Sequence, residues 1–266
     1  MNILYLGDIM AAPGLELIER TLPALRKELA VDLVVAQAEN VSEGKGLSKE
    51  DFARLRKAGV DACSGGNWTL QDPAIYDHLN DPQQPVTRPG NYPQGTPGTR
   101  YKFIQTSNGQ VLLVSLLGAI VGKDADKPTD NPLHIIDEIL EETKDQPKVA
   151  TVVNFHGDYS SQKVIIGQYL DGRVTVVVGD HWHVPTADTM VLAKGTAYQT
   201  DVGMCGVLHS SLGISFDSVI PRWRDNVRNR NEIETKGPFQ LNALLVETDD
   251  ATGLATSAVA IRKITE

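Results

Sequence analysis

Short apolar runs alternate with amphipathic segments along about the first 180 residues, and this alternation limits what the chain can fold into. Apolar runs at 2–8, 32–40 and 60–67 predict buried strands. Apolar residues at three- and four-residue spacing predict helices at 15–29 and 48–59. Strands that alternate with helices are typical of an α/β fold with a mostly parallel sheet.

The rest of the chain continues this pattern and adds two hairpins. We expect helices at 131–144 and 160–172 and strands at 148–156 and 173–183. The hairpins are two apolar runs around Asn108-Gly109 and two more within 239–264. Together the hairpins suggest a second sheet, packed on the first within a single domain that spans residues 1–266. The Pro/Gly-rich segment 88–98 is predicted to be a loop at the rim of a site.

Composition and charge exclude several classes of protein. The chain has 25 basic and 34 acidic residues, a formal charge of −9, which argues against binding of extended nucleic acid. No run approaches the roughly 18 apolar residues of a membrane span, and the N-terminus reads as a strand rather than a signal peptide. Cys63 and Cys205 have no metal or redox spacing. We therefore expect a cytoplasmic protein without a membrane partner.

Polar side chains that could bind metal stand where the predicted strands end. In chain order they are Asp8, Glu39, Asn40, Asn67, His156, His181 and His183. Ligands of parallel α/β sheets bind outside the carboxyl ends of the strands, so we expect these side chains to meet at one edge. Carboxylate, amide oxygen and imidazole together suit two divalent metal ions with one bridging carboxylate.

Each of these residues also has a plainer interpretation. Asp8, Asn40 and Asn67 could be caps or turn formers, and His156 could be a hydrogen-bonded core histidine. In an extended segment, alternation would place His181 and His183 on one side with Trp182 opposite. The metal interpretation rests on the complete set of ligand types. The other histidines, His78, His134 and His209, are predicted to be solvated surface residues.

Several motifs resemble those of a known family. "GDIMAAPG", "AEN", "GGN", "RPGNYPQGTPG", "FHGDYSSQK", "LDGRV", "GDHWHVPTAD" and "GTAYQTDVGM" occur in the order seen in the bacterial YmdB-like family of calcineurin-like metallophosphoesterases. The resemblance covers most of the chain, to about residue 215. It implies a four-layer α-β-β-α fold, in which a two-sheet β-sandwich is flanked by helices. It also implies phosphodiesterase activity on 2′,3′-cyclic nucleotides and similar small phosphoesters, two divalent metal ions (iron, manganese or zinc) and a homo-oligomer.

The resemblance also implies how the metal ligands divide. One metal would take Asp8, Glu39, Asn40 and His183. The other would take Glu39, Asn67, His156 and His181, so that Glu39 bridges the two. The broader superfamily usually has a histidine two residues after the first aspartate, where this chain has Met10, and the YmdB-like pattern with Asn40 fits better.

The chain departs from the family pattern at four positions near this site. Trp68 replaces the histidine taken as the general acid, and an indole N–H does not give up its proton near neutral pH. Asp180 and Trp182 replace small hydroxyl residues, and Asn154 replaces an aspartate. We therefore expect a phosphoesterase with weakened or altered activity. The alternative is a catalytically impaired, metal- and nucleotide-binding regulatory protein, in which Trp68 and Trp182 stack on a base. A different two-metal hydrolase is the third hypothesis.

Overall fold

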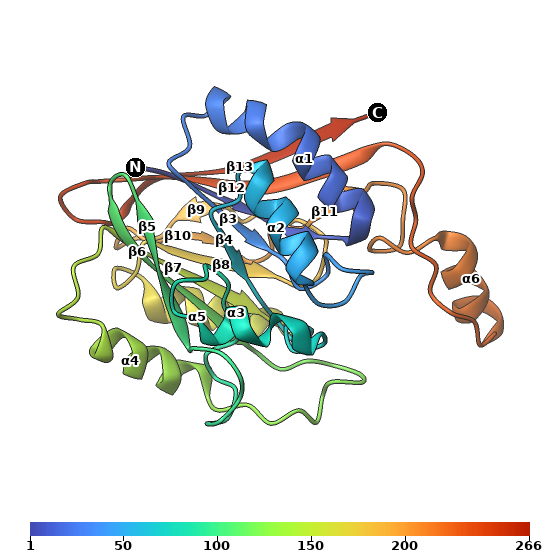
Figure 1. Cartoon of the computed structure of the whole chain (residues 1–266), viewed down its shortest axis with the longest axis horizontal. Helices are drawn as coiled ribbons and strands as arrows, with labels where there is room; N and C mark the ends of the chain where they lie inside the picture. The colour runs from blue at the N-terminus through green and yellow to red at the C-terminus, as the bar shows by residue number, and fades with distance from the viewer.

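Two β-sheets lie face to face in the computed structural model, which describes residues 1–266 (Figure 1). The seven strands of the first sheet are β1 (Asn2–Leu6), β2 (Asp8–Ile9), β3 (Leu33–Gln37), β4 (Ala62–Ser64), β11 (Met204–Val207), β12 (Phe239–Thr248) and β13 (Ala255–Thr265). The six strands of the second are β5 (Tyr101–Thr106), β6 (Gly109–Leu117), β7 (Ala150–His156), β8 (Val176–Asp180), β9 (Met190–Val191) and β10 (Ala197–Gln199).

Helices cover the outer faces of the two sheets. The six α-helices are α1 (Ala11–Glu28), α2 (Lys49–Ala58), α3 (Tyr76–Asn80), α4 (Pro132–Glu142), α5 (Ser160–Leu170) and α6 (Phe216–Asp225), and a 3-10 turn spans Pro73–Ile75. Figure 1 shows α1 and α2 on one side of the molecule and α4 and α5 on the opposite side. The expected sandwich flanked by helices is confirmed.

The strand order differs from the expectation in one respect. The first sheet runs β2-β11-β12-β1-β3-β4, with β13 paired to β12, and the second runs β5-β6-β7-β8-β10-β9. Both predicted hairpins exist, but β5-β6 and β12-β13 belong to different sheets. The parallel strands are likewise divided, with β1, β3 and β4 in the first sheet and β6, β7 and β8 in the second. Each sheet is therefore mixed, and the hairpins do not form a sheet of their own.

Side-chain alternation explains the layers. In β1, Leu4 and Leu6 point into the core beneath α1 and α2, whereas Ile3 and Tyr5 point into the core between the sheets. A third core lies between the second sheet and α4 and α5. Strands buried on both faces must be apolar throughout, which is why they appear in the sequence as continuous apolar runs.

Local signals set the helix ends. Ser48 caps α2 as predicted, because its hydroxyl accepts a hydrogen bond from the backbone N–H of Asp51 at 3.1 Å. Gly59 ends the same helix at φ 105°, a conformation that favours glycine. No helix of the chain combines the length and the apolar character that crossing a bilayer requires.

Helix α6 was not predicted and stands away from the two-sheet body (Figure 1). Its side chains Phe216, Ile220 and Trp223 are exposed, and the Trp223 side chain is 84% accessible. Their spacing of four and three residues places them on one face of the helix.

Candidate metal centre

The side chains predicted from the strand ends come from both sheets. The first sheet and its loops supply Asp8, Glu39, Asn40 and Asn67, and the second supplies His156, His181 and His183. Because parallel strands of both sheets end at the same end of the sandwich, the two groups face each other there. The expectation of one edge of one sheet is therefore corrected to an edge shared by two sheets.

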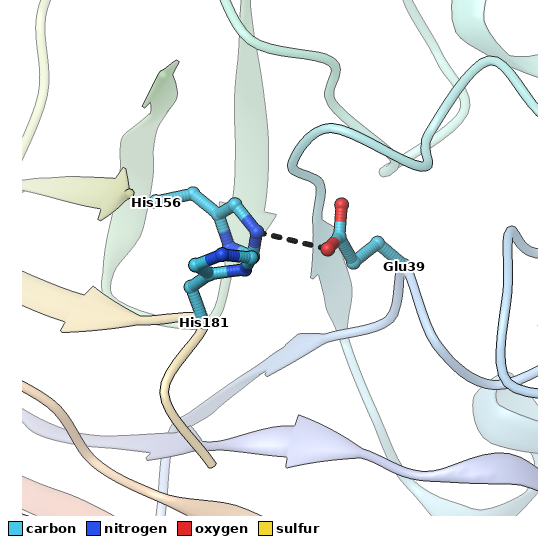
Figure 2. Close-up of side chains that lie close together, drawn as sticks. All are labelled: Glu39, His156 and His181. Atoms are coloured by element: carbon cyan, nitrogen blue, oxygen red, sulfur yellow. Dashed lines mark ion pairs between the residues drawn. The ribbon is translucent and has the colours of Figure 1, made fainter. Parts of the chain in front are cut away.

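His156, the last residue of β7, lies beside His181, and its ring points toward Glu39 (Figure 2). Its imidazole is fully buried, and Nε2 lies 2.9 Å from Glu39 Oε1 and 3.0 Å from Asn67 Oδ1. The His181 ring is 4.4 Å away, centroid to centroid. A Cβ on Gly66 would come within 2.5 Å of both Glu39 and His156, so only glycine lets the turn before Asn67 approach this closely.

The other ring nitrogen of His156 is held by Asp180, the last residue of β8. Nδ1 lies 2.6 Å from Asp180 Oδ1, and the carboxylate is fully buried. Its Oδ2 accepts hydrogen bonds from the hydroxyl of Tyr5 at 2.7 Å and from Gln37 Nε2 at 3.0 Å, and Asn154 Nδ2 also donates to it. This carboxylate therefore orients the imidazole and fixes which nitrogen carries the proton.

The remaining acceptors fit a bound cation. With a metal bound, Nδ1 of His156 would keep its proton and Nε2 would turn its lone pair to the metal, alongside the oxygens of Glu39 and Asn67. Asp8 Oδ1 and Asn40 Oδ1 are buried and have no hydrogen-bond partner. Buried unpaired oxygens are costly, and a metal that takes carboxylate, amide and imidazole ligands satisfies all of these atoms.

The electrostatics of the site also favour a cation. Burial, followed by the charge of Asp180, raises the pKa of Asp8 well above its usual value. Burial alone would lower the pKa of His156, but the carboxylates of Glu39 and Asp180 outweigh it and raise that pKa. Burial and the neighbouring His156 lower the pKa of His181 to about 4, so its imidazole is neutral and can act as a ligand. The carboxylates of Asp8, Glu39 and Asp180 are buried together, and a bound cation would offset their negative charge.

His181 and His183 reach the site through a strained turn. The strand ends at Asp180, and the two histidines have φ of 97° and 61°, so the predicted strand alternation is wrong here. The His181 N–H donates to Asp8 Oδ2 at 3.2 Å. His183 Nδ1 lies 3.2 Å from the carbonyl oxygen of Leu212, and its Nε2 lies 3.8 Å from Asp8 Oδ1. The turn brings both imidazoles to the site.

A buried ion pair braces this turn. Lys163 Nζ, on α5, lies 2.7 Å from Asp201 Oδ2 and donates to the carbonyl oxygen of Asp180 at 2.6 Å. Asp201 Oδ2 also accepts the Trp182 backbone N–H at 3.0 Å. Lys163 Nζ lies 4.0 Å from the centroid of the Trp182 ring. The indole Nε1 of Trp182 donates to the carbonyl oxygen of Asp158 at 3.0 Å.

Trp68 lies at the rim of the site, where its backbone contacts Glu39 and its ring contacts two lysines. Its backbone N–H donates to Glu39 Oε2 at 2.8 Å. Its half-buried ring has Lys45 Nζ 4.6 Å and Lys127 Nζ 5.5 Å from its centroid. Lys127 Nζ also donates to the carbonyl oxygen of Asn67 at 3.2 Å. Two lysines therefore stand at the rim, and one of them, Lys127, is also paired with Asp124 at 3.0 Å.

The other three histidines lie outside this group. His134 and His209 are exposed, as predicted. His78 is half-buried and packs edge-on against Phe52, with ring centroids 5.4 Å apart, so its prediction as a solvated residue is corrected.

The charged residues that support this site were not among the predicted ligands, although Asp180 ends β8 and is one of the departures from the family pattern. These are Asp158, Lys163, Asp180 and Asp201, and Asp158 Oδ2 lies 3.3 Å from His181 Nε2. All four lie within the motifs "FHGDYSSQK", "GDHWHVPTAD" and "GTAYQTDVGM". The sequence could therefore have indicated them as charged residues in the same motifs as the predicted ligands or in the motif that follows.

Comparisons with known proteins agree over the whole chain. The family model described as "YmdB-like protein" matches residues 4–261. The chain is 34% identical over 265 residues to a 2′,3′-cyclic-nucleotide 2′-phosphodiesterase of Bacillus subtilis (strain 168), covering 99% of this chain and 96% of the relative. It is also similar to the crystal structure of a hypothetical protein from Thermus thermophilus, with a TM-score of 0.89, 34% identity and full coverage of both chains. A structure of a phosphatase from Mycoplasma pneumoniae gives a TM-score of 0.91 at 29% identity, covering 100% of this chain and 94% of that one.

Proposed function

Because this chain belongs to the YmdB-like family, we propose that it is a metal-dependent phosphodiesterase that acts on small phosphoesters, 2′,3′-cyclic nucleotides among them. The observation that carries the proposal is the convergence of Glu39, Asn67 and His156 on one point, beside the unpaired buried oxygens of Asp8 and Asn40. Such a ligand set suits divalent cations better than any other ligand class.

Two cations would be held as the resemblance implies. One would take Asp8, Glu39, Asn40 and His183, and the other Glu39, Asn67, His156 and His181. Bound there, divalent ions would supply positive charge to the phosphoryl oxygens and lower the pKa of water. Manganese, iron and zinc all accept these ligand types.

Trp68 alters what the site can do with the leaving group. A positioned general acid contributes roughly 10²- to 10⁴-fold in rate, and the indole supplies no such proton. A ribose hydroxyl leaves poorly without a proton, whereas an aryl oxide needs none. Electrostatic stabilisation is usually the larger contribution and does not depend on Trp68. We therefore expect turnover that is weak on cyclic nucleotides and less affected on aryl phosphodiesters.

The regulatory alternative has less support. It requires Trp68 and Trp182 to stack on a base, but Lys45 and Lys163 hold ammonium groups over these rings. Lys45 and Lys127 are better suited to attract an anionic substrate to the rim.

Metal content and a substrate panel test the proposal. Protein loaded with Mn²⁺ should bind about two ions per chain and hydrolyse bis(p-nitrophenyl) phosphate. Fewer than one ion per chain after reconstitution, or no hydrolysis of any phosphodiester, would contradict the proposal.

Trp68→His tests the role of the missing acid. We expect the variant to hydrolyse 2′,3′-cyclic AMP roughly 10²- to 10⁴-fold faster than the parent protein, because it restores a proton donor. Turnover of bis(p-nitrophenyl) phosphate should change little. If the ratio of the two rates is the same in both proteins, the loss of the acid does not explain the specificity.

A homo-oligomer and a cytoplasmic location stay predictions. The exposed apolar face of α6, with Phe216, Ile220 and Trp223, is consistent with contact between copies of the chain.

A further inference from the structure

Tyr92 carries a buried hydroxyl that the protein leaves unpaired. The side chain is 6% exposed, and its hydroxyl has no hydrogen-bond partner. The two other buried tyrosines are both paired, because Tyr5 donates to Asp180 at 2.7 Å and Tyr198 lies 2.6 Å from Thr200 Oγ1. An unpaired buried hydroxyl is costly, and that of Tyr92 is one of eight buried side-chain atoms without a partner, two of which belong to Asp8 and Asn40 of the candidate metal centre.

Backbone contacts fasten the loop that carries Tyr92 to the sheet edge where the candidate metal centre lies. The preceding residue, Asn91, accepts a hydrogen bond from the Leu117 N–H and donates to the Leu117 carbonyl oxygen, both at 2.8 Å. Leu117 ends β6 and is in register with His156 across the β6–β7 pair. The loop at 88–98 is therefore fastened to the edge at which the predicted ligands meet.

The charges around Tyr92 support the same placement. Burial raises the pKa of Tyr92, and the carboxylates of Glu39 and Asp124 raise it further. Asp124 in turn accepts a hydrogen bond from Asn67 Nδ2 at 3.0 Å. The phenol therefore keeps its proton at neutral pH and can only donate to a neighbouring anion.

We propose that Tyr92 contacts the substrate, with its hydroxyl donating a hydrogen bond to an oxygen of the phosphoester bound at the metal centre. This inference rests on the proposed function for the nature of the ligand. It makes Tyr92 a hydrogen-bond donor at a site where Trp68 provides no proton, and it explains why the hydroxyl is unpaired in the free protein.

Tyr92→Phe tests the inference, with Tyr198→Phe as a matched control. Tyr92→Phe removes no hydrogen bond from the free protein, so its Tm should be unchanged or rise by up to about 4 °C. Its kcat/KM on bis(p-nitrophenyl) phosphate should fall about 10- to 100-fold, the effect of losing a hydrogen bond to a charged group. Tyr198→Phe should show the opposite pattern, with a Tm lower by about 2–4 °C and unchanged kcat/KM.

Two results would overturn the inference. One is a Tyr92→Phe variant with the kcat/KM of the parent protein. The other is a Tm lower by about 2 °C or more, as in the Tyr198→Phe control, because the hydroxyl would then already be bonded in the free protein.

Binding of inorganic phosphate separates this inference from the proposed function. If the parent protein loaded with Mn²⁺ hydrolyses no phosphodiester, the proposed function fails, and calorimetric titration with phosphate then decides the role of Tyr92. Roughly tenfold weaker phosphate binding by Tyr92→Phe would support the contact. Equal binding by the two proteins, or no binding by either, would overturn it.

Discussion

At the scale of single residues, Asp180 on β8 supplies the carboxylate that contacts His156 Nδ1. The resemblance to the YmdB-like family implies an aspartate at position 154 and a small hydroxyl residue at 180, whereas this chain has Asn154 and Asp180. Asn154 Nδ2 donates to Asp180, so the two side chains meet beside His156. In this chain the carboxylate of Asp180, on β8, reaches the Nδ1 of His156 at 2.6 Å.

Asp180→Asn should weaken Mn²⁺ binding about 10- to 100-fold, because the hydrogen-bond partner of a ligating histidine sets its orientation and basicity. Calorimetric titration with Mn²⁺ measures the change. The double variant Asn154→Asp with Asp180→Asn returns the carboxylate to its family position and should recover part of the affinity. Equal affinity in the parent protein and Asp180→Asn would show that this carboxylate does not position His156.

At the scale of elements, the turn after β8 depends on α5. His181 and His183 adopt left-handed φ values that non-glycine residues rarely hold, and such strain persists only where the surroundings impose it. Lys163, on α5, supplies that restraint through Asp201 and the carbonyl oxygen of Asp180. The helix therefore supports the candidate metal centre without providing a predicted ligand.

Lys163→Met should lower the free energy of unfolding by about 3–5 kcal/mol, because it leaves the Asp201 carboxylate buried without its partner. Adding Asp201→Asn should restore much of the stability, as measured by urea unfolding. Mn²⁺ binding should remain weak in the double variant, because the turn has lost its brace. Full metal affinity in the stable double variant would refute a positioning role for the pair.

For the whole molecule, the candidate metal centre draws its side chains from both sheets. Asp8, Glu39 and Asn67 come from the first sheet, and His156 and His181 come from the second. A cation at this position would bind only when the sheets are assembled, so it should stabilise the entire fold.

Saturating Mn²⁺ should therefore raise the Tm, and removal of metal with EDTA should lower it. A site filled at a hundred times its Kd adds about 2.7 kcal/mol, which corresponds to roughly 5–11 °C. Scanning calorimetry should show one transition that moves as a unit, as the single-domain prediction requires. Two transitions, of which only one responds to Mn²⁺, would contradict both expectations.

The sequence by itself determined the local elements and the identity of the polar residues that end the strands. The apolar runs of β1, β3, β7 and β8 and the cap at Ser48 could be read from the chain, because periodicity and capping depend on neighbouring residues. The short strands β2, β9 and β10 were not predicted, because two- or three-residue strands depend on their pairing partners more than on their own sequence. Helix α6 was not predicted either.

Only the tertiary structure decided how these elements share the site. It divided the hairpins between two sheets, replaced the expected alternation at His181 and His183 with a strained turn, and brought Asp180 to His156. It also left the Tyr92 hydroxyl buried and unpaired. These features depend on contacts between residues far apart in the chain, whose free energies exist only once the two sheets have packed together.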